Sequence, residues 1–288
     1  MRPNTSAASI VPDRHAMEAY LAASTARARD DALEKAQGVM YEAWEQAAAR
    51  SRLALARKAL GISPLCADAY CLLAGEAKTD AEARALYSRG LDAGELALGP
   101  DGFSEYAGHF WGFLETRPYM RARHGLALTL LRLGEEEAAI SHFRAMLELN
   151  PDDNQGIRYL LLATLLRRED ADAIKALLAQ YEDDWSVYWL YTRALIAFRE
   201  GRADDSSTRK LLKEARSCNE HVPGILAGTE PSVTTDRGYI TAGGPEEATE
   251  YVLDCGAAWR RIPGAVAWLG AAEADGRAVR KPARKERP

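Results

Sequence analysis

The segment 120–153 carries hydrophobic residues at intervals of three and four, which places them on one face of a helix. Large and small apolar side chains alternate along this segment: Leu126, Ala127, Leu130, Ala139 and Phe143. Small residues allow two antiparallel helices to cross closely, and large ones fill the space beside the crossing. The pattern therefore predicts a pair of helices that pack against each other.

Boundary residues divide this segment into two helices. Gly134 suits the left-handed C-cap of the first helix, and Pro151 cannot continue the second. Asp152 and Asp153 offer carboxylates to the N-terminus of the next helix. The order of these features, over about 34 residues, matches a tetratricopeptide repeat (TPR), which is a helix, a turn and a helix.

Similar patterns flank this segment on both sides. They predict an all-α, TPR-like α-solenoid, a right-handed superhelix of antiparallel helix pairs. The predicted repeats lie at about 33–66, 67–93, 120–153, 154–187 and 188–222. Pro245 and Pro263 each predict the start of a C-terminal helix within 245–270, because proline suits the first helical position. We expect a single helical domain over residues 16–270.

Other segments interrupt the repeat spacing. Residues 94–117 break the period, with a turn at 99–102 and then a short helix or ordered loop rich in aromatic residues. Residues 224–244 are rich in glycine and threonine and predict a long connecting loop. Residues 1–15 and the basic tail 271–288 are predicted to be disordered.

Composition narrows the class of partner. The 288 residues are 47% hydrophobic and 27% charged, as in ordinary globular proteins, with a net charge of −5. This acidic balance disfavours nucleic acid or an anionic membrane as a partner. No apolar stretch approaches the roughly 20 residues of a membrane span, and no leader segment is evident. The four cysteines form no CxxC pair, so we expect mostly buried thiols and a cytoplasmic location.

No motif for catalysis is evident. The five histidines form no HExxH motif or zinc set, and the chain has no P-loop or GxGxxG. Glu105 and His109 are four residues apart, but two ligands are too few for a metal site. His142 is expected on the exposed outer face of its helix. We therefore predict no catalytic residue, metal or cofactor.

The first helix of each repeat is expected to line the concave face of the solenoid. Positions 2, 5, 9, 12 and 13, counted from residues 120, 154 and 187, give the candidate binding groove: Arg121, His124, Leu128, Leu131, Arg132, Gln155, Arg158, Leu162, Leu165, Leu166, Tyr188, Tyr191, Leu195, Phe198 and Arg199. Arginine pairs with carboxylates through two parallel hydrogen bonds, and tyrosine adds contact area at a low entropic cost. These residues over an apolar floor would suit a peptide or a partner helix.

Two interpretations of these residues remain open. The arginines could instead be solvated or paired with acidic residues of neighbouring repeats, and the leucines could be covered by the C-terminal helices. A second class of function, a small-molecule binder or enzyme, would hold an anionic ligand between the helices and loop 224–244. Self-association through the aromatic segment around Trp111 is also open.

The C-terminal half resembles a known family. His221-Val222-Pro223, Glu247-Ala248, Tyr251, Trp259 and the closing 265–269 are similar to the C-terminal part of the suppressor of tumorigenicity 7 family. The segment 117–160 is similar to bacterial TPR proteins that share this half. The resemblance covers about residues 110–270 and implies an all-helical TPR scaffold without a known catalytic reaction. Animal members carry hydrophobic membrane segments that this chain lacks. The leading hypothesis is a cytoplasmic scaffold for protein interactions.

Overall fold

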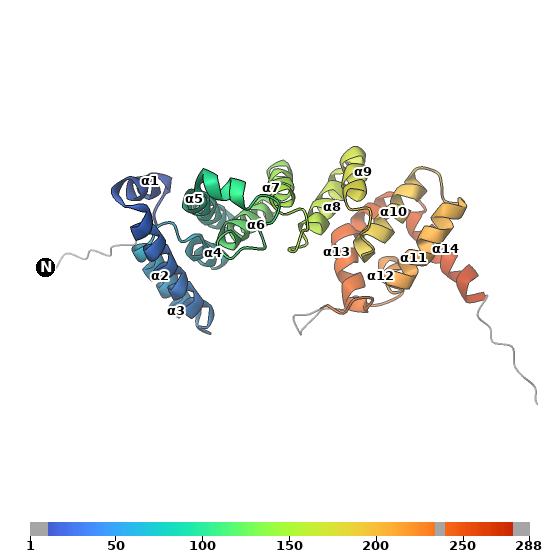
Figure 1. The fold of residues 1–288 in the computed structure, drawn as a ribbon. Helices are drawn as coiled ribbons and strands as arrows, with labels where there is room; N and C mark the ends of the chain where they lie inside the picture. Colours follow the sequence, from blue (N-terminus) through green and yellow to red (C-terminus); the bar gives the residue numbers. More distant parts are fainter. Residues whose placement is uncertain (1–10, 234–239, 279–288) are drawn as a thin grey trace, which may run out of the picture. The chain divides into compact units, whose positions relative to one another are not determined.

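The computed structural model describes residues 11–233 and 240–278, and the side chains up to residue 271. This part of the chain forms fourteen helices and no strand, so the all-α prediction is confirmed. Consecutive helices pack in pairs, as expected for an α-solenoid (Figure 1). The chain divides into two compact units, residues 1–161 and 162–288, and the boundary falls within α8 (Ile157–Arg168).

Unit 1 is built from seven complete helices and the start of α8. The helices are α1 (Arg14–Ala23), α2 (Ala26–Trp44), α3 (Ala49–Ile62), α4 (Ala67–Gly75), α5 (Asp80–Glu105), α6 (Arg117–Arg132) and α7 (Glu136–Leu149). The most extensive contacts join α2 to α3, α4 to α5, α5 to α6, and α6 to α7. The first helices of the pairs, α2, α4 and α6, also contact one another in that order. They share one face of the unit.

The central predicted repeat corresponds to α6 and α7. Gly134 has a φ of 77°, a conformation that glycine adopts without strain, and it ends α6. α7 ends at Leu149, two residues before Pro151. Ala127, Ala139 and Phe143 are all fully buried between the helices. The sequence pattern therefore predicted where α6 and α7 end and which of these side chains are buried, whereas α6 begins at Arg117, before the predicted start at 120.

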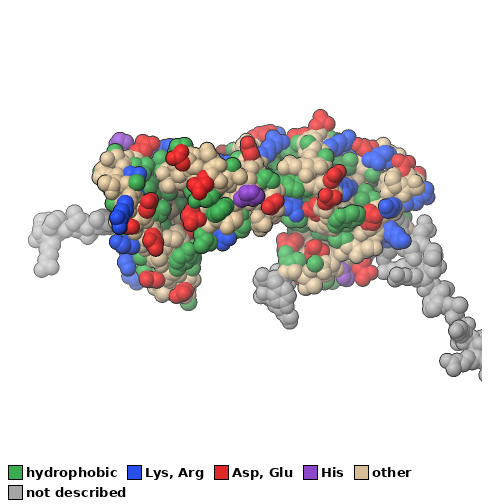
Figure 2. Space-filling model, in the orientation of Figure 1, with side chains coloured by type: hydrophobic (Ala, Val, Ile, Leu, Met, Phe, Trp, Pro, Cys, Tyr) green, Lys and Arg blue, Asp and Glu red, His purple; other side chains and the backbone are tan. Residues whose placement is uncertain are grey.

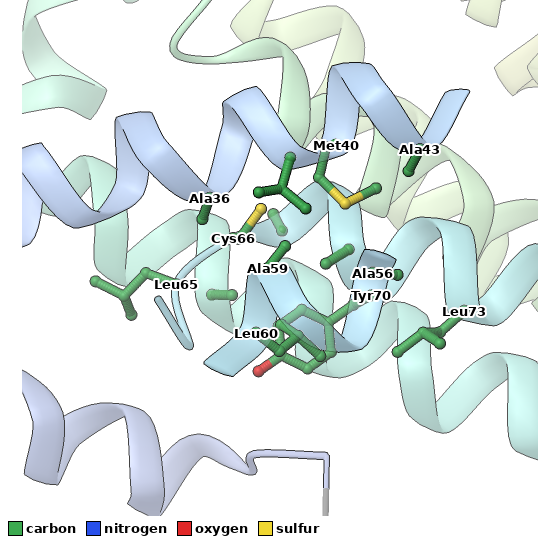
Figure 3. Close-up of a cluster of buried hydrophobic side chains, with 14 of the residues drawn as sticks. Ala36, Met40, Ala43, Ala56, Ala59, Leu60, Leu65, Cys66, Tyr70 and Leu73 are labelled. Atoms are coloured by element: carbon green, nitrogen blue, oxygen red, sulfur yellow. The ribbon is translucent and has the colours of Figure 1, made fainter. Parts of the chain in front are cut away.

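A second hydrophobic cluster ties the first two helix pairs of unit 1 together (Figure 3). Met40 on α2 lies among small residues of α2 and α3, where Ala36, Ala56 and Ala59 let the helices approach closely. Tyr70 on α4 is buried in the same cluster, and its hydroxyl donates to the carbonyl of Pro64 at 3.0 Å. The buried ring therefore keeps its one polar atom hydrogen-bonded.

The helix α5 extends further than the sequence pattern predicts. The predicted turn at 99–102 is instead a kink inside α5, where Gly99 has φ 62° and ψ 176°. Pro100 then restarts the helix, because its missing N–H is not needed in a first turn. α5 ends at Glu105, so exposed His109 lies in the following loop and does not share a helix with Glu105.

Residues 106–116 form an ordered loop against the end of α7. The amide of Phe110 donates to the carbonyl of Leu149 at 3.2 Å, and the amide of Trp111 donates to Asn150 Oδ1 at 3.2 Å. The Phe110 ring is fully buried and lies 5.2 Å from the ring of Phe103. The aromatic side chains of this segment thus anchor the loop, as the sequence predicts for an ordered insertion.

Unit 2 contains the rest of α8 and six further helices: α9 (Ala171–Gln180), α10 (Val187–Arg199), α11 (Ser206–Cys218), α12 (Val222–Ala227), α13 (Pro245–Arg261) and α14 (Ala265–Ala278). α10 packs on α11, and α13 contacts α10, α12 and α14. The predicted loop 224–244 begins inside α12, because Pro223 suits the first turn of that short helix. Pro245 opens α13 as predicted, whereas Pro263 lies in the turn before α14, which begins at Ala265.

The chain termini are described in part. α1 begins at Arg14, inside the segment predicted to be disordered, because Asp13 Oδ1 accepts the amide of Ala16 at 2.9 Å and caps the helix. α14 reaches Ala278, inside the predicted basic tail. The predictions of disorder for residues 1–10 and 279–288 lie outside the described residues, as does part of the predicted loop at 234–239.

Candidate functional site: the α2–α4–α6 face

Three helices of unit 1 bring a polar network to one face. We call this surface the α2–α4–α6 face and define it by Gln37, Tyr41, Trp44, Asp68, Arg121 and His124. Arg121 of α6 donates to both carboxylate oxygens of Asp68 on α4, through Nε at 2.7 Å and Nη2 at 2.6 Å. Gln37 Nε2 of α2 donates to Asp68 Oδ2 at 2.8 Å. One carboxylate thus links three helices.

The ion pair is asymmetric in its exposure to solvent. The Asp68 side chain is fully buried, whereas 36% of the Arg121 side chain is exposed. A buried carboxylate needs its hydrogen bonds, because removing it from water is costly. Asp68 therefore depends on Arg121 and Gln37, whereas the Arg121 side chain remains partly exposed to solvent.

Two aromatic rings lie uncovered beside this network. Tyr41 is 53% exposed and Trp44 is 44% exposed, and their ring centroids are 5.7 Å apart on α2. The guanidinium carbon of Arg121 lies 5.6 Å from the centroid of the Trp44 ring, a cation–π arrangement. Adjacent exposed aromatic residues beside an arginine are typical of protein-binding surfaces.

Most residues of this face were not among the candidates predicted from the sequence. They nevertheless occupy the same positions in their repeats as the predicted candidates do. The same positions counted from residue 33 give Gln37, Tyr41 and Trp44, and position 2 counted from residue 67 gives Asp68. The repeat positions that predicted Arg121 and His124 therefore also identify their neighbours. The weak consensus match of the first repeats hid this signal.

The other candidates on α6 lie along the same helix. His124 is half-buried, and its Nε2 has no hydrogen-bond partner among the described residues. Burial lowers the pKa of its imidazole. Leu128 is half-buried. Arg132 is exposed, and its Nε lies 2.7 Å from Asp80 Oδ1 at the start of α5. Arg121 and Arg132 are thus paired with acidic residues of a neighbouring predicted repeat, which was the alternative to an open binding groove.

The next two candidates lie where α7 leads into α8. The carboxylate of Asp153 is buried and accepts the backbone amides of Ile157 and Arg158 at 2.7 and 2.9 Å, so it caps α8. The Arg158 side chain also approaches this carboxylate, with Nη1 3.3 Å from Oδ2. Gln155 is half-buried, and its buried Oε1 has no hydrogen-bond partner in the part of the chain that the structure describes. Arg158 therefore stabilises the start of a helix.

In unit 2 most of the remaining candidates are buried or half-buried, and Arg199 is exposed. Leu162 is fully buried, and Tyr191 is buried with its hydroxyl donating to the carbonyl of Asn219 at 2.6 Å. Tyr188 donates to Asp254 Oδ2 of α13 at 2.6 Å. Helix α13 thus lies across the side of α10 that the sequence assigns to the groove.

Other polar residues differ from their predicted surroundings. His142 is half-buried instead of exposed, and burial together with the neighbouring charge of Arg123 lowers the pKa of its imidazole to about 4. Cys66 and Cys255 are buried, whereas Cys71 and Cys218 are half-buried, and all four are free thiols. Burial raises the pKa of the Cys66 thiol to about 12, which makes it a poor nucleophile.

The polar groups near loop 224–244 are mainly acidic. Glu230 Oε2 lies 3.0 Å from His221 Nδ1, and Glu247 Oε2 accepts Asn219 Nδ2 at 3.0 Å and the amide of Gly243 at 2.9 Å. These carboxylates disfavour an anionic ligand among the residues described there. A cavity of about 660 Å³ lies elsewhere, between the end of α1 and the kink of α5, and is lined mainly by apolar residues such as Leu21, Leu96 and Phe103.

Neither a metal cluster nor a spanning helix is found in the described part of the chain. No group of three histidine, cysteine, aspartate or glutamate side chains is placed there to hold a metal ion. None of the described helices has both the length and the apolar character needed to cross a membrane. On the face shown in Figure 2, acidic and basic side chains are interspersed over both units.

Comparison with known proteins supports the resemblance noted in the sequence. The chain is 28% identical over 261 residues to "Suppressor of tumorigenicity 7 protein-like" of Rattus norvegicus, an alignment that covers 82% of the chain and 46% of the relative. It is 28% identical to "Protein ST7 homolog" of Drosophila pseudoobscura pseudoobscura, with 82% and 48% covered. The Caenorhabditis elegans "Protein ST7 homolog" is 27% identical, with 80% and 49% covered.

The similarity extends through both units. The chain spans about half the length of the curated relatives it matches. A model of the ST7 protein family matches residues 23–287, which is wider than the resemblance read from the motifs and includes the α2–α4–α6 face. This match covers most of the chain, and the protein therefore belongs to the ST7 family.

Proposed function

We propose that this protein is a non-catalytic interaction scaffold of the tetratricopeptide type, which holds a partner helix or peptide against its α2–α4–α6 face. The observation that carries the proposal is the pair of exposed rings, Tyr41 and Trp44, beside the anchored guanidinium of Arg121. Large exposed aromatic residues that gather on one face favour a binding surface. The proposal confines the predicted groove to unit 1, because α13 covers Tyr188 and Tyr191.

The geometry also explains how such a surface could bind specifically. The bidentate contact with Asp68 fixes the Arg121 side chain, so little entropy is lost when a partner contacts it. The rings of Tyr41 and Trp44 have few rotatable bonds and offer large apolar areas. A rigid polar anchor beside aromatic area supports recognition of a folded partner segment without any chemistry of its own.

Affinity capture from source-cell lysate tests this proposal. Trp44→Ala should remove a specific partner, at least tenfold by quantitative mass spectrometry, while circular dichroism stays unchanged. Trp185→Ala is the matched control, because Trp185 is 61% exposed in unit 2. Equal capture by the two variants and the wild type would contradict the proposal and would favour the alternative of a small-molecule binder. Charge reversals at Arg121 or Arg158 are poorer tests, because both side chains contact buried carboxylates.

A further inference from the structure

Helix α13 shows how a helix packs on the first helix of a pair in this chain. Tyr251 and Asp254 are three residues apart, so they lie on the same side of α13. Asp254 Oδ2 accepts the hydroxyl of Tyr188 at 2.6 Å. The Tyr251 ring lies 5.4 Å from the Tyr188 ring and 5.7 Å from the Tyr191 ring. Asp254 and Tyr251 thus bring a carboxylate and an aromatic ring into contact with the two tyrosines of α10.

The α10 residues that contact α13 occupy the same repeat positions as two residues of the α2–α4–α6 face. Tyr188 and Tyr191 occupy positions 2 and 5 of their predicted repeat, where the central repeat has Arg121 and His124. The residue at position 2 donates to a carboxylate in both repeats. The hydroxyl of Tyr188 donates to Asp254, and the guanidinium of Arg121 donates to Asp68. In unit 2 the carboxylate comes from a packed helix, whereas in unit 1 it comes from Asp68 of α4.

The guanidinium of Arg121 has further hydrogen-bonding capacity. It carries five N–H donors, and the contact with Asp68 uses only Nε and one N–H of Nη2. Its Nη1 makes no hydrogen bond with the described residues, and the side chain is partly exposed. A second carboxylate can therefore accept a hydrogen bond from Nη1, beside Tyr41 and Trp44. Those two rings can receive an aromatic side chain in an edge or offset arrangement.

We propose that the α2–α4–α6 face binds an amphipathic partner helix that carries an aromatic residue and, three residues later, a carboxylate. This inference rests on the proposed function and names the class of partner. The aromatic ring of the partner packs against Trp44 and Tyr41, and its carboxylate accepts from Arg121. Helices that lie in a groove are recognised through residues at such spacings.

A peptide with the sequence of α13, residues 245–261, provides a probe. A hydrocarbon staple through positions 253 and 257, both exposed in the structure, holds it helical without altering the contacting side. The peptide carries Cys255→Ser and a fluorophore, and its binding to the full chain is followed by anisotropy. Matched peptides carry Asp254→Asn or Tyr251→Ala. We expect each of these changes to weaken binding by about tenfold or more.

Variants of the chain locate the bound peptide. Trp44→Ala should weaken binding at least tenfold, whereas Trp185→Ala and Tyr188→Phe should leave it unchanged. Sensitivity to Tyr188→Phe instead of Trp44→Ala would mean that the peptide replaces α13 in unit 2, and would overturn the inference. Absence of binding would overturn it as well.

The two proposals can fail separately. If all three peptides bind equally and Trp44→Ala weakens each of them, the face binds helices but the inferred aromatic and carboxylate preference is wrong. If no peptide binds while lysate capture still depends on Trp44, the scaffold function stands and only the partner class is overturned.

Discussion

Arg121→Met should lower the free energy of unfolding by about 3–5 kcal/mol, because it leaves a buried carboxylate without its cation. Asp68 is fully buried and would retain only the hydrogen bond from Gln37. Methionine preserves much of the side-chain length. The loss of stability therefore arises from the missing guanidinium and not from a cavity. Urea unfolding followed by circular dichroism measures the change.

A second ion pair on the same helix serves as the control. The side chains of Arg132 and Asp80 are 51% and 39% exposed, so neither charge is buried and Arg132→Met should cost less than about 1 kcal/mol. The double variant Arg121→Met/Asp68→Leu should recover part of the lost stability, since it removes the uncompensated charge. Equal effects of the substitutions at Arg121 and Arg132 would show that Asp68 does not depend on its pairing with Arg121.

Phe143→Ala should cost about 3–5 kcal/mol, because it opens a cavity at the crossing of α6 and α7. The Phe143 ring is fully buried on α7, in a region where small residues such as Ala127 and Ala139 bring the two helices close together. The same urea experiment measures the loss. The expected effect tests whether the central repeat is assembled as its sequence pattern predicts.

Phe113 provides the matched control for this substitution. It belongs to the same unit but is exposed in the loop 106–116, where its ring lies 4.6 Å from that of Tyr106. Phe113→Ala should therefore change the free energy of unfolding by less than about 1 kcal/mol. If both phenylalanine variants had similarly small effects, the register of the central repeat would be wrong.

The helices were predictable because their signals are local. Gly134 and Pro151 mark helix ends through backbone geometry, and Ala127 and Phe143 mark a helix crossing through size. The kink at Gly99 was predicted as a turn, because glycine before proline suits both structures. In the extension of α5 beyond the kink, the Phe103 ring lies 5.1 Å from the Tyr119 ring of α6, a contact that the local sequence does not reveal.

The candidate site was predictable only in part, because burial depends on contacts between distant residues. Arg121 was correctly placed on the first helix of its repeat, but its partner Asp68 lies 53 positions away. Tyr188 was assigned to an open groove, yet Asp254 on α13, 66 positions further on, accepts its hydroxyl. A repeat pattern assigns residues to a face, but it does not indicate which faces another segment of the chain covers.

Site-specific photocrosslinking tests most directly whether the α2–α4–α6 face contacts a partner. Benzoylphenylalanine replaces Trp44 in one variant and Trp185 in another, both expressed in the source cell. We expect position 44 to crosslink to one dominant protein through a helical segment, and position 185 to give no such product. Identical products from the two positions, or none from position 44, would contradict the assignment of the binding surface to this face.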